Sequence, residues 1–481
     1  MTYLKALRED APLLDAYLRY FEVARTPFTI PGHKQRAHKL DLGLGAVVDT
    51  DTPLYGGLDE IKLTNQTLEL AESLAAKLWG GDYARFSTGG STHVNQAVIL
   101  ALGKPGDKIA VARTAHRSVL SALVLAGLEP IWLSPEIDVA TGVPTGISVA
   151  ELERVLPQKP IALLLTEPGY LGTISQLPEL ISVAHAHQIP VVIDAAWGAH
   201  FGFNSQLPKH VMQLGADALI TSTHKALPGY SASALLIARG EFLNLARLEQ
   251  SFETTHTTSP AGAPLASIDG CRALLQSRGS ELLNELISQV TKFKSEISAH
   301  FDRPIFLSPT DFQPGRFDPV KIVLRANQLG TSGVAIENEL LKANIRVEMA
   351  DRDTVVFLAT LADDAESFAQ LAKALLPILQ SLVGPPRESA TALSWSVVPQ
   401  IGISMRDAYF ADTEMIPADN ATGRISADLI APYPPGVAVV APGEVLTSEI
   451  LKGLAANKAA GVRIAYATDA SLQSYRVVKS D

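Results

Sequence analysis

The chain has 481 residues, of which 47% are hydrophobic and 19% are charged, and its formal net charge is -10 at pH 7. This is the composition of a globular protein with two or three domains, not that of a disordered chain. The acidic balance argues against a nucleic-acid-binding surface and is compatible with a cationic small substrate. Because Cys271 is the single cysteine, an intramolecular disulfide framework and a multi-thiolate metal site are both excluded.

The start of the chain gives no sign of a targeting or membrane segment. Residues 1–20 mix charged and apolar side chains, which is not the pattern of a signal peptide. No later run approaches the roughly twenty apolar residues that a bilayer-spanning helix needs, and a single cysteine suits a reducing compartment. We therefore expect a soluble cytoplasmic protein without a membrane or nucleic-acid partner.

Apolar periodicity divides the first half of the chain into two parts. Leucines and aromatic residues recur at helical spacing over residues 1–25, so we assign residues 1–64 to an N-terminal arm and loop segment. Helical stretches then alternate with short apolar runs, which is typical of a mostly parallel sheet covered on both faces. The strands are predicted at residues 83–87, 108–111, 130–133, 161–166, 190–194 and 218–221. This large α/β domain occupies residues 65–285.

Two smaller domains are predicted after this core. A helix over residues 280–300 runs without a breaker and leads out of the large domain. Residues 286–385 are assigned to a small α/β domain with strands near 320–324 and 354–358. A Gly-Pro-Pro linker then precedes a C-terminal domain, residues 386–481.

A phosphate-binding loop is predicted at Gly89–Thr92, directly before a helix. Gly90 lets main-chain amides approach an anion, Ser91 and Thr92 add hydroxyl donors, and the helix contributes its positive N-terminal end. No Gly-Lys-Ser or Gly-Lys-Thr follows, so a nucleoside triphosphate is disfavoured. Taken alone, a glycine pair before a helix is more often a tight turn.

Three further side chains follow predicted strands. Asp194 ends a strand at the edge where open parallel sheets bind ligands, and its carboxylate could hold a proton on a ring nitrogen. An aspartate there is also a common helix cap. His116 could stack on an aromatic ring or be structural, and Trp197 could reach a cofactor ring or simply fill space.

Lys225 ends the segment Ser222–Lys225, which follows a short apolar strand. A lysine in this position can form a Schiff base with an aldehyde cofactor, whereas most lysines seen alone are surface residues. The order of the phosphate loop, His116, Asp194 and Lys225 at the ends of successive strands favours the cofactor. It resembles the arrangement of aspartate-aminotransferase-like, fold type I pyridoxal phosphate enzymes.

Four ordered motifs extend this resemblance over nearly the whole chain, at residues 27–35, 222–225, 257–260, and 423–427 with 432–436. They resemble the Orn/Lys/Arg decarboxylase family. The chain lacks room for the N-terminal wing domain of the long inducible members, so it is similar to the short, biosynthetic group. The resemblance implies pyridoxal 5'-phosphate-dependent decarboxylation of a cationic amino acid in polyamine biosynthesis, with arginine favoured and lysine or ornithine next.

The resemblance also implies a set of cofactor-binding residues, namely Gly90, Ser91, Thr92, His116, Asp194, Trp197, Ser222, His224, Lys225, Thr258 and Ser259. Lys225 would carry the cofactor, His224 would lie on the reacting face, and Asp194 would contact the pyridine nitrogen; these three are the implied catalytic residues. His116 would lie on the ring, and the hydroxyls would hold the phosphate. The pair Thr258 and Ser259 is expected to come from a neighbouring subunit, which implies a homodimer or higher homo-oligomer with shared active sites.

Two departures from the family leave the substrate end of the site open. Asp194–Trp197 reads Asp-Ala-Ala-Trp where short members often have Asp-Glu-Ala-His, and Ala261–Pro264 replaces the usual Ser-Tyr. Acidic residues should meet the substrate side chain, with four candidates: Asp59, Glu60, Glu348 and Asp351. Transamination, for which Arg346 could bind the carboxylate, aldol cleavage and a non-catalytic homologue remain alternatives. No metal is expected, because His185 and His187 cannot easily converge on one ion.

Overall fold

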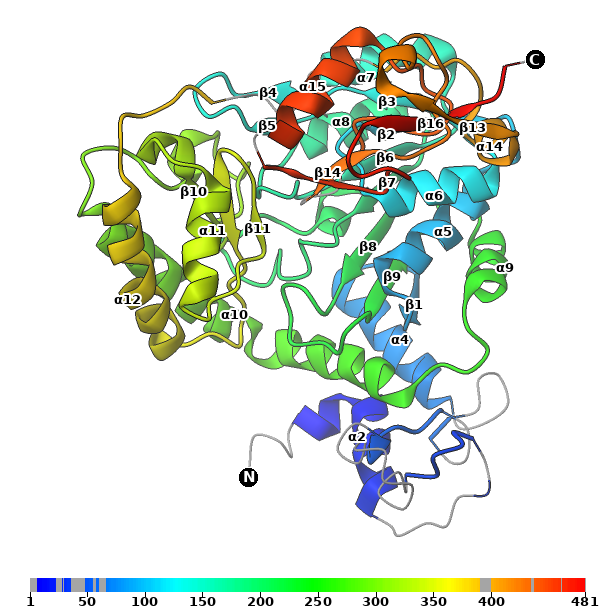
Figure 1. The fold of residues 1–481 in the computed structure, drawn as a ribbon. Coiled ribbons are helices and arrows are strands. Elements are labelled where there is room, and N and C mark those ends of the chain that lie inside the picture. The colour runs from blue at the N-terminus through cyan, green and yellow to red at the C-terminus, as the bar shows by residue number, and fades with distance from the viewer. Residues whose placement is uncertain are drawn as a thin grey trace.

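The computed structural model describes residues 7–22, 28, 30–35, 48–54, 58–59, 66–389, 399–433, 437–459 and 461–480. An α/β unit with a large sheet forms the centre of the molecule, a smaller α/β unit lies beside it, and a C-terminal unit lies against its far end (Figure 1). The predicted fold class is therefore confirmed. Parts of the motifs at 27–35 and 432–436, and the candidate Glu60, fall outside the described residues.

The large sheet has seven strands in the order β1-β9-β8-β7-β6-β2-β3. Their bounds are β1 (Tyr83–Ser87), β2 (Lys108–Ala112), β3 (Glu129–Leu133), β6 (Leu163–Thr166), β7 (Val191–Asp194), β8 (Ala218–Ser222) and β9 (Ala234–Ala238). Neighbouring strands are parallel from β3 to β8, whereas β9 pairs antiparallel with both β8 and β1. The six strands expected from the sequence are present, and β9 is an additional strand.

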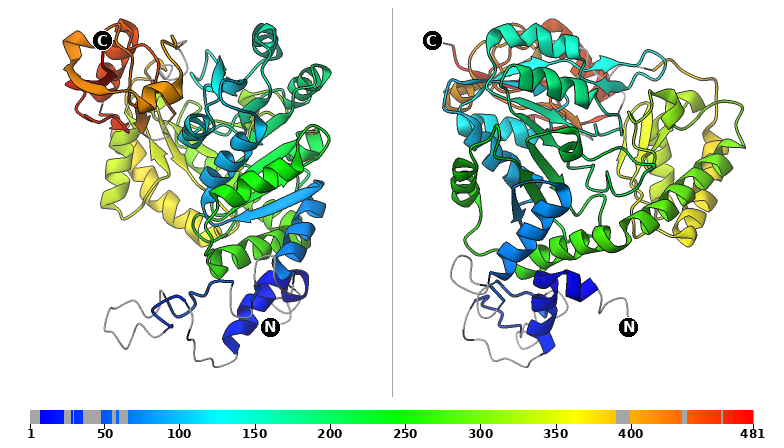
Figure 2. Two further views of the ribbon diagram at one scale, coloured as in Figure 1. Left: turned by 90° about the vertical axis from the view of Figure 1, so that its right-hand side faces the viewer. Right: turned by 180° about the vertical axis from the view of Figure 1, so that it is seen from behind.

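Helices cover both faces of this sheet (Figure 2). Their bounds are α4 (Thr67–Trp79), α5 (Gly90–Leu102), α6 (Arg117–Ala126), α7 (Val149–Val155), α8 (Leu177–Ala186) and α9 (Leu245–Thr255). In β7, Val191 and Ile193 pack into the core with α4, α7 and α8, and Val192 packs on the other face with α5, α6 and α9. Burial on both faces explains why the strands read as continuous apolar runs.

The long helix α10 (Gly262–Ser298) runs from the large unit to the small one (Figure 1). It begins well before residue 280, so the proposed domain boundary at 285 falls inside a helix. The small unit has the antiparallel order β10-β12-β11, with β10 (Ile322–Arg325), β11 (Met349–Ala350) and β12 (Thr354–Phe357), and the helices α11 (Gly333–Lys342) and α12 (Ala365–Leu382). The division into domains remains a prediction.

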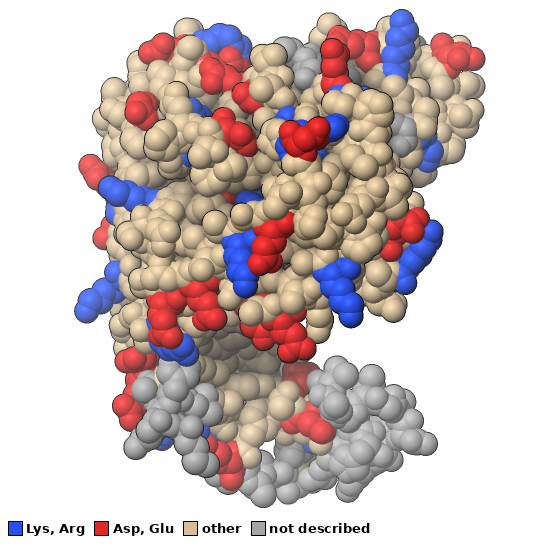
Figure 3. Space-filling model, turned by 90° about the vertical axis from the view of Figure 1, so that its left-hand side faces the viewer, with Lys and Arg blue, Asp and Glu red and all other residues tan. Residues whose placement is uncertain are grey.

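The N-terminal helix α2 (Pro12–Glu22) packs on α10, where buried Asp269 accepts a hydrogen bond from the Leu13 amide at 2.8 Å. This agrees with the amphipathic helix expected near the start of the chain. None of the described helices combines the length and the apolar character that crossing a bilayer requires. On the face shown in Figure 3, acidic and basic side chains are interspersed, which is the pattern of an ordinary solvated surface.

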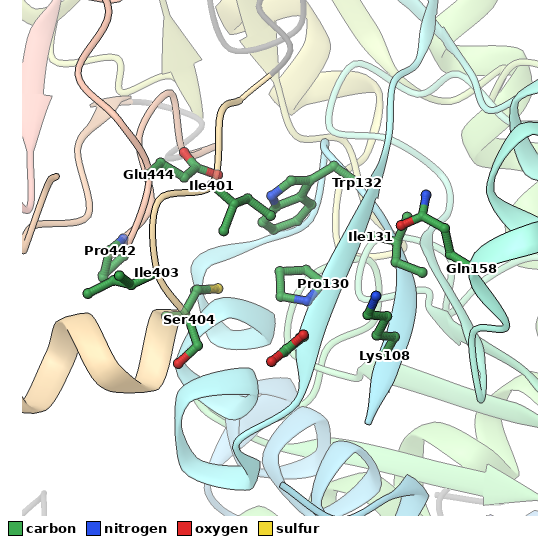
Figure 4. A pocket seen from close by; sticks show the side chains of 12 residues that line it. Lys108, Pro130, Ile131, Trp132, Gln158, Ile401, Ile403, Ser404, Pro442 and Glu444 are labelled. Carbon is green, nitrogen blue, oxygen red and sulfur yellow. The ribbon is translucent and has the colours of Figure 1, made fainter. Parts of the chain in front are cut away.

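The C-terminal unit packs against the β2 and β3 side of the sheet. Its elements are α14 (Met405–Phe410), β13 (Thr413–Pro417), β14 (Ala431–Tyr433), α15 (Ser448–Ala459), β15 (Arg463–Ala465) and β16 (Ser474–Val478). Arg113, which follows β2, forms a buried ion pair with Glu444, with Nη1 2.6 Å from Oε1. A crevice of about 280 Å³ borders this pair, where Trp132 of β3 faces Ile401 and Glu444 (Figure 4).

Candidate active site

Three neighbouring parallel strands, β6, β7 and β8, end at one edge of the sheet, and each is followed or ended by polar side chains. Thr166 ends β6 and Asp194 ends β7, and the two residues are register partners. Ser222 ends β8, and Lys225 follows three residues later. The carboxyl ends of parallel strands form the usual ligand-binding edge of an open α/β sheet, so the strand-end positions converge as the sequence predicts.

A cavity of about 340 Å³ lies at this edge. Nine of the predicted site residues line it, namely Gly90, Ser91, Thr92, His116, Asp194, Trp197, Ser222, His224 and Lys225. Thr258 and Ser259 are exposed and lie outside the cavity wall that one chain forms. The roles of all these residues remain predictions, but nine of them share one cavity of ligand size.

The first turn of α5 and the end of β8 form a hydroxyl-rich corner of the cavity. Gly90 opens α5 with a φ of 67°, a left-handed conformation that glycine adopts without strain. Ser91 Oγ lies 2.7 Å from Ser222 Oγ, so two hydroxyls from separate elements meet there. Hydroxyls beside a helix N-terminus are a typical setting for a phosphate group.

A buried hydrogen-bond network fixes the opposite functional group, the Asp194 carboxylate. Asp194 is 2% exposed, and its Oδ2 accepts a hydrogen bond from Asn95 Nδ2 at 2.9 Å while Oδ1 accepts one from the Ala196 amide at 3.2 Å. Asn95 Nδ2 also donates to Ser118 Oγ at 3.0 Å, and this hydroxyl lies 2.8 Å from His116 Nδ1. The network therefore orients His116 and Asp194 together.

The polar groups of the cavity match those of the cofactor that the fold implies. Thr166 Oγ1 is buried and has no hydrogen-bond partner among the described residues, although it belongs to the cavity wall. Buried polar atoms in proteins nearly always have a partner, so this hydroxyl is available to hydrogen-bond a ligand in the cavity. A carboxylate for a ring nitrogen, hydroxyls for a phosphate and a lysine for an aldehyde lie in the same cavity, and they fit pyridoxal 5'-phosphate.

Burial affects the pKa of the two central side chains. It lowers the pKa of Lys225 from its ordinary value of 10.5, against the opposing effect of the charges on Asp194 and Glu348. It also lowers the pKa of His224, whose Nδ1 lies 2.8 Å from the Ser233 carbonyl oxygen. A lysine amine with a lowered pKa is more often neutral and therefore nucleophilic.

The three acidic candidates that the structure describes have different environments. Glu348 accepts a hydrogen bond from the Tyr170 hydroxyl at 2.9 Å, and Tyr170 lines the cavity. Asp59 is buried and accepts the Leu68 amide at the start of α4, and Asp351 accepts the Thr354 amide in a turn. The structure thus gives Asp59 and Asp351 structural roles and leaves Glu348 beside the site.

Sequence reasoning missed several residues at the site. Thr166 ends its strand in the same way as Asp194, so its position alone could have identified it. Asn95 lies inside α5, where nothing in its local sequence points to Asp194. Val437 reaches the cavity from the C-terminal unit, far away in the chain.

The sheet order and a cavity with a lysine, a strand-end aspartate and a hydroxyl corner define a fold type I pyridoxal phosphate enzyme. Residues 11–367 match the Orn/Lys/Arg decarboxylase major domain, and residues 395–463 match the C-terminal domain of the same family. The chain belongs to the Orn/Lys/Arg decarboxylase family, a family of amino-acid decarboxylases. The predicted family and enzyme class are confirmed.

Individual relatives agree with this assignment. An arginine decarboxylase of Bacillus anthracis is 31% identical over 486 residues, which cover 98% of this chain and 97% of the relative. An arginine decarboxylase of Bacillus subtilis is 30% identical over 485 residues and covers 98% of both chains. The Escherichia coli constitutive lysine decarboxylase has a similar structure, with a TM-score of 0.79, 20% identity, and coverage of 99% of this chain and 83% of that one.

Proposed function

We propose that this protein decarboxylates arginine to agmatine with pyridoxal 5'-phosphate as its cofactor. The observation that carries the proposal is that Lys225, Asp194 and the hydroxyl corner line one cavity, with Glu348 acting electrostatically on Lys225. Full-length similarity to two arginine decarboxylases favours arginine over lysine and ornithine.

The cofactor would be held at four points. The Lys225 amine would bind its aldehyde, and the Asp194 carboxylate would keep a proton on the ring nitrogen. Gly90, Ser91, Thr92 and Ser222 would hold the phosphate, while His116 and Trp197 would lie against the ring. When bound, the cofactor supplies an electron sink for the pair that the broken carbon–carbon bond leaves behind.

The chain's own groups would then orient the substrate and return a proton. Glu348, held by Tyr170, would bind the guanidinium and so fix the distance of the α-carbon from Lys225. His224 or Lys225 would deliver a proton to the α-carbon after carbon dioxide leaves. The lowered pKa of Lys225 moves it from 10.5 toward the range in which proton transfer is efficient, whereas the lowered pKa of His224 favours its neutral form.

A neighbouring subunit would complete this site. Thr258 and Ser259 are exposed in the single chain, as residues that serve a neighbour's cavity would be. We therefore propose at least a homodimer. We also propose a cytoplasmic location, because a single cysteine, the buried Cys271, suits a reducing compartment.

The test is to incubate the purified holoprotein separately with each standard amino acid and to identify the products by mass spectrometry. The proposal predicts agmatine and carbon dioxide from arginine at the highest rate. Cadaverine as the main amine product would identify lysine as the substrate, and putrescine would identify ornithine. Keto acids without carbon dioxide would exclude decarboxylation, and the absence of any product would support a non-catalytic role.

A further inference from the structure

A second buried lysine lies next to the site. Lys321 directly precedes β10 in the small unit, and its side chain is buried, with the whole residue 5% exposed. Among the described residues, its Nζ makes no hydrogen bond and no carboxylate oxygen lies within ion-pair distance of it. Its Nζ lies over two aromatic rings, 4.0 Å from the centroid of Trp197 and 5.4 Å from the centroid of Tyr170.

These two rings form part of the wall of the active-site cavity. Both Trp197 and Tyr170 line it, and they meet edge to face with centroids 5.2 Å apart. The Lys225 amine lies 4.3 Å from the centroid of the same Trp197 ring. The Lys321 ammonium therefore contacts the same Trp197 ring as the Lys225 amine and lies directly behind residues that line the cavity, although Lys321 is not itself a lining residue.

A buried ammonium that lacks an anionic partner is unfavourable, and contact with aromatic rings offsets only part of the cost. Burial lowers the pKa of Lys321 to about 8, so the group is still mostly protonated at neutral pH. Two acidic groups act electrostatically on Lys321, namely Asp318 and Glu348, and each also has a hydrogen-bond partner of its own. Glu348 accepts a hydrogen bond from the Tyr170 hydroxyl. Asp318 accepts a hydrogen bond from the Val320 amide, and its Oδ2 lies 3.2 Å from His200 Nε2.

We propose that Lys321 binds the α-carboxylate of the substrate amino acid. This inference rests on the proposed function. A cationic amino acid has one anionic group, its α-carboxylate, and Lys321 is a buried cation without an anionic partner beside Lys225. Glu348 would meet the opposite, cationic end, so the two side chains would fix both ends of the substrate.

The charge at Lys321 would also distinguish substrate from product. When the bond between the α-carbon and the carboxyl carbon breaks, its electrons pass to the cofactor and the carboxylate leaves as neutral carbon dioxide. A proton then replaces it on the α-carbon. The amine product has no group for Lys321, so the contact favours substrate binding and not product binding.

The test uses arginine and agmatine as a matched pair, because agmatine is arginine without its α-carboxylate. Steady-state assays of the holoenzyme give kcat and KM for arginine and the inhibition constant for agmatine. Lys321→Met should raise KM for arginine by about 10-fold or more and change the agmatine constant less than about 2-fold. Lys321→Arg should restore most of the arginine affinity.

Lys373→Met is the control, because Lys373 is an exposed lysine of α12 in the same small unit and should leave both constants unchanged. If Lys321→Met weakens the binding of arginine and of agmatine equally, Lys321 only supports the position of Trp197, and the proposal is overturned. It is also overturned if neither constant changes.

If Lys321→Met does not fold, the wild type provides a second measurement. Argininamide, which lacks the carboxylate charge, should inhibit no more strongly than agmatine, and stronger inhibition would overturn the proposal. If the wild type releases no carbon dioxide from arginine, the proposed function fails by itself. Equilibrium dialysis with labelled arginine and agmatine then still tests Lys321, because an equal loss of both ligands in Lys321→Met would overturn its role.

Discussion

The buried pair Arg113–Glu444 should be a major support of the C-terminal unit. Arg113 donates from Nη1 and Nη2 to the two carboxylate oxygens of Glu444, at 2.6 Å and 2.9 Å, and their side chains are 3% and 2% exposed. Glu444 also accepts the Ala441 amide at 2.8 Å, and Arg113 donates to the Val439 carbonyl oxygen at 2.8 Å. Glu444→Gln keeps the size of the side chain but removes its charge.

The expected loss of stability follows from the charge left behind. Two unit charges about 4 Å apart interact by about 4 kcal/mol at an effective dielectric constant of about 20. Removing one partner of a buried pair typically costs about 3–5 kcal/mol, because the other charge stays buried without compensation. We therefore expect Glu444→Gln to destabilise the fold by about 3–5 kcal/mol. Arg113→Met together with Glu444→Gln should cost less than the sum of the single changes.

Urea unfolding followed by circular dichroism, at one protein concentration, measures this loss. The matched control is Glu281→Gln, because Arg278 Nη2 lies at the same 2.6 Å from Glu281 Oε1, but the pair is on the surface. The control should leave the unfolding midpoint unchanged within error. A Glu444→Gln midpoint equal to that of the control would refute the reasoning from burial.

Asn95→Ala removes the amide that donates to Asp194, so an absorbance titration should show cofactor affinity about 10- to 100-fold weaker, and unchanged affinity would exclude this role. Burial raises the pKa of Glu167 from 4.5 to about 7, so the folded protein keeps a proton that the unfolded chain has lost in this window. This stabilisation is complete below about pH 4.5 and disappears as the pH rises through about 7. The melting temperature of Glu167→Gln should therefore decline less over that pH range than that of the wild type. An equal decline of the two melting temperatures would contradict this. Glu348→Gln should raise KM for arginine about 10-fold or more in steady-state assays, whereas an unchanged KM would place the guanidinium elsewhere.

Strand-end positions were predictable from the sequence for a physical reason. Short apolar runs bounded by helices predict parallel strands, and parallel strands bring their carboxyl ends to one edge. His116, Asp194, Ser222 and Lys225 all follow from that rule and line one cavity in the structure. The antiparallel strand β9 was not predicted, because a short apolar run alone does not define its pairing.

Other parts of the site depend on tertiary packing. Asn95 lies in a helix and meets Asp194 only after α5 packs on the sheet, so its role has no local signal. Asp59 was a substrate candidate because of its acidic loop, but its carboxylate accepts the Leu68 amide in the first turn of α4 instead. The start of α10 was also missed, since Gly262 and Pro264 suggest a turn, although proline is tolerated in a first helical turn.

The most direct test of the central claim is to give arginine with an isotope-labelled carboxyl group to the wild type and to Lys225→Ala, both supplied with pyridoxal 5'-phosphate. We predict that the wild type releases labelled carbon dioxide and agmatine in equal amounts and that the variant releases neither. Labelled keto acid without carbon dioxide from the wild type would contradict the account. Undiminished carbon dioxide release by Lys225→Ala would contradict it as well.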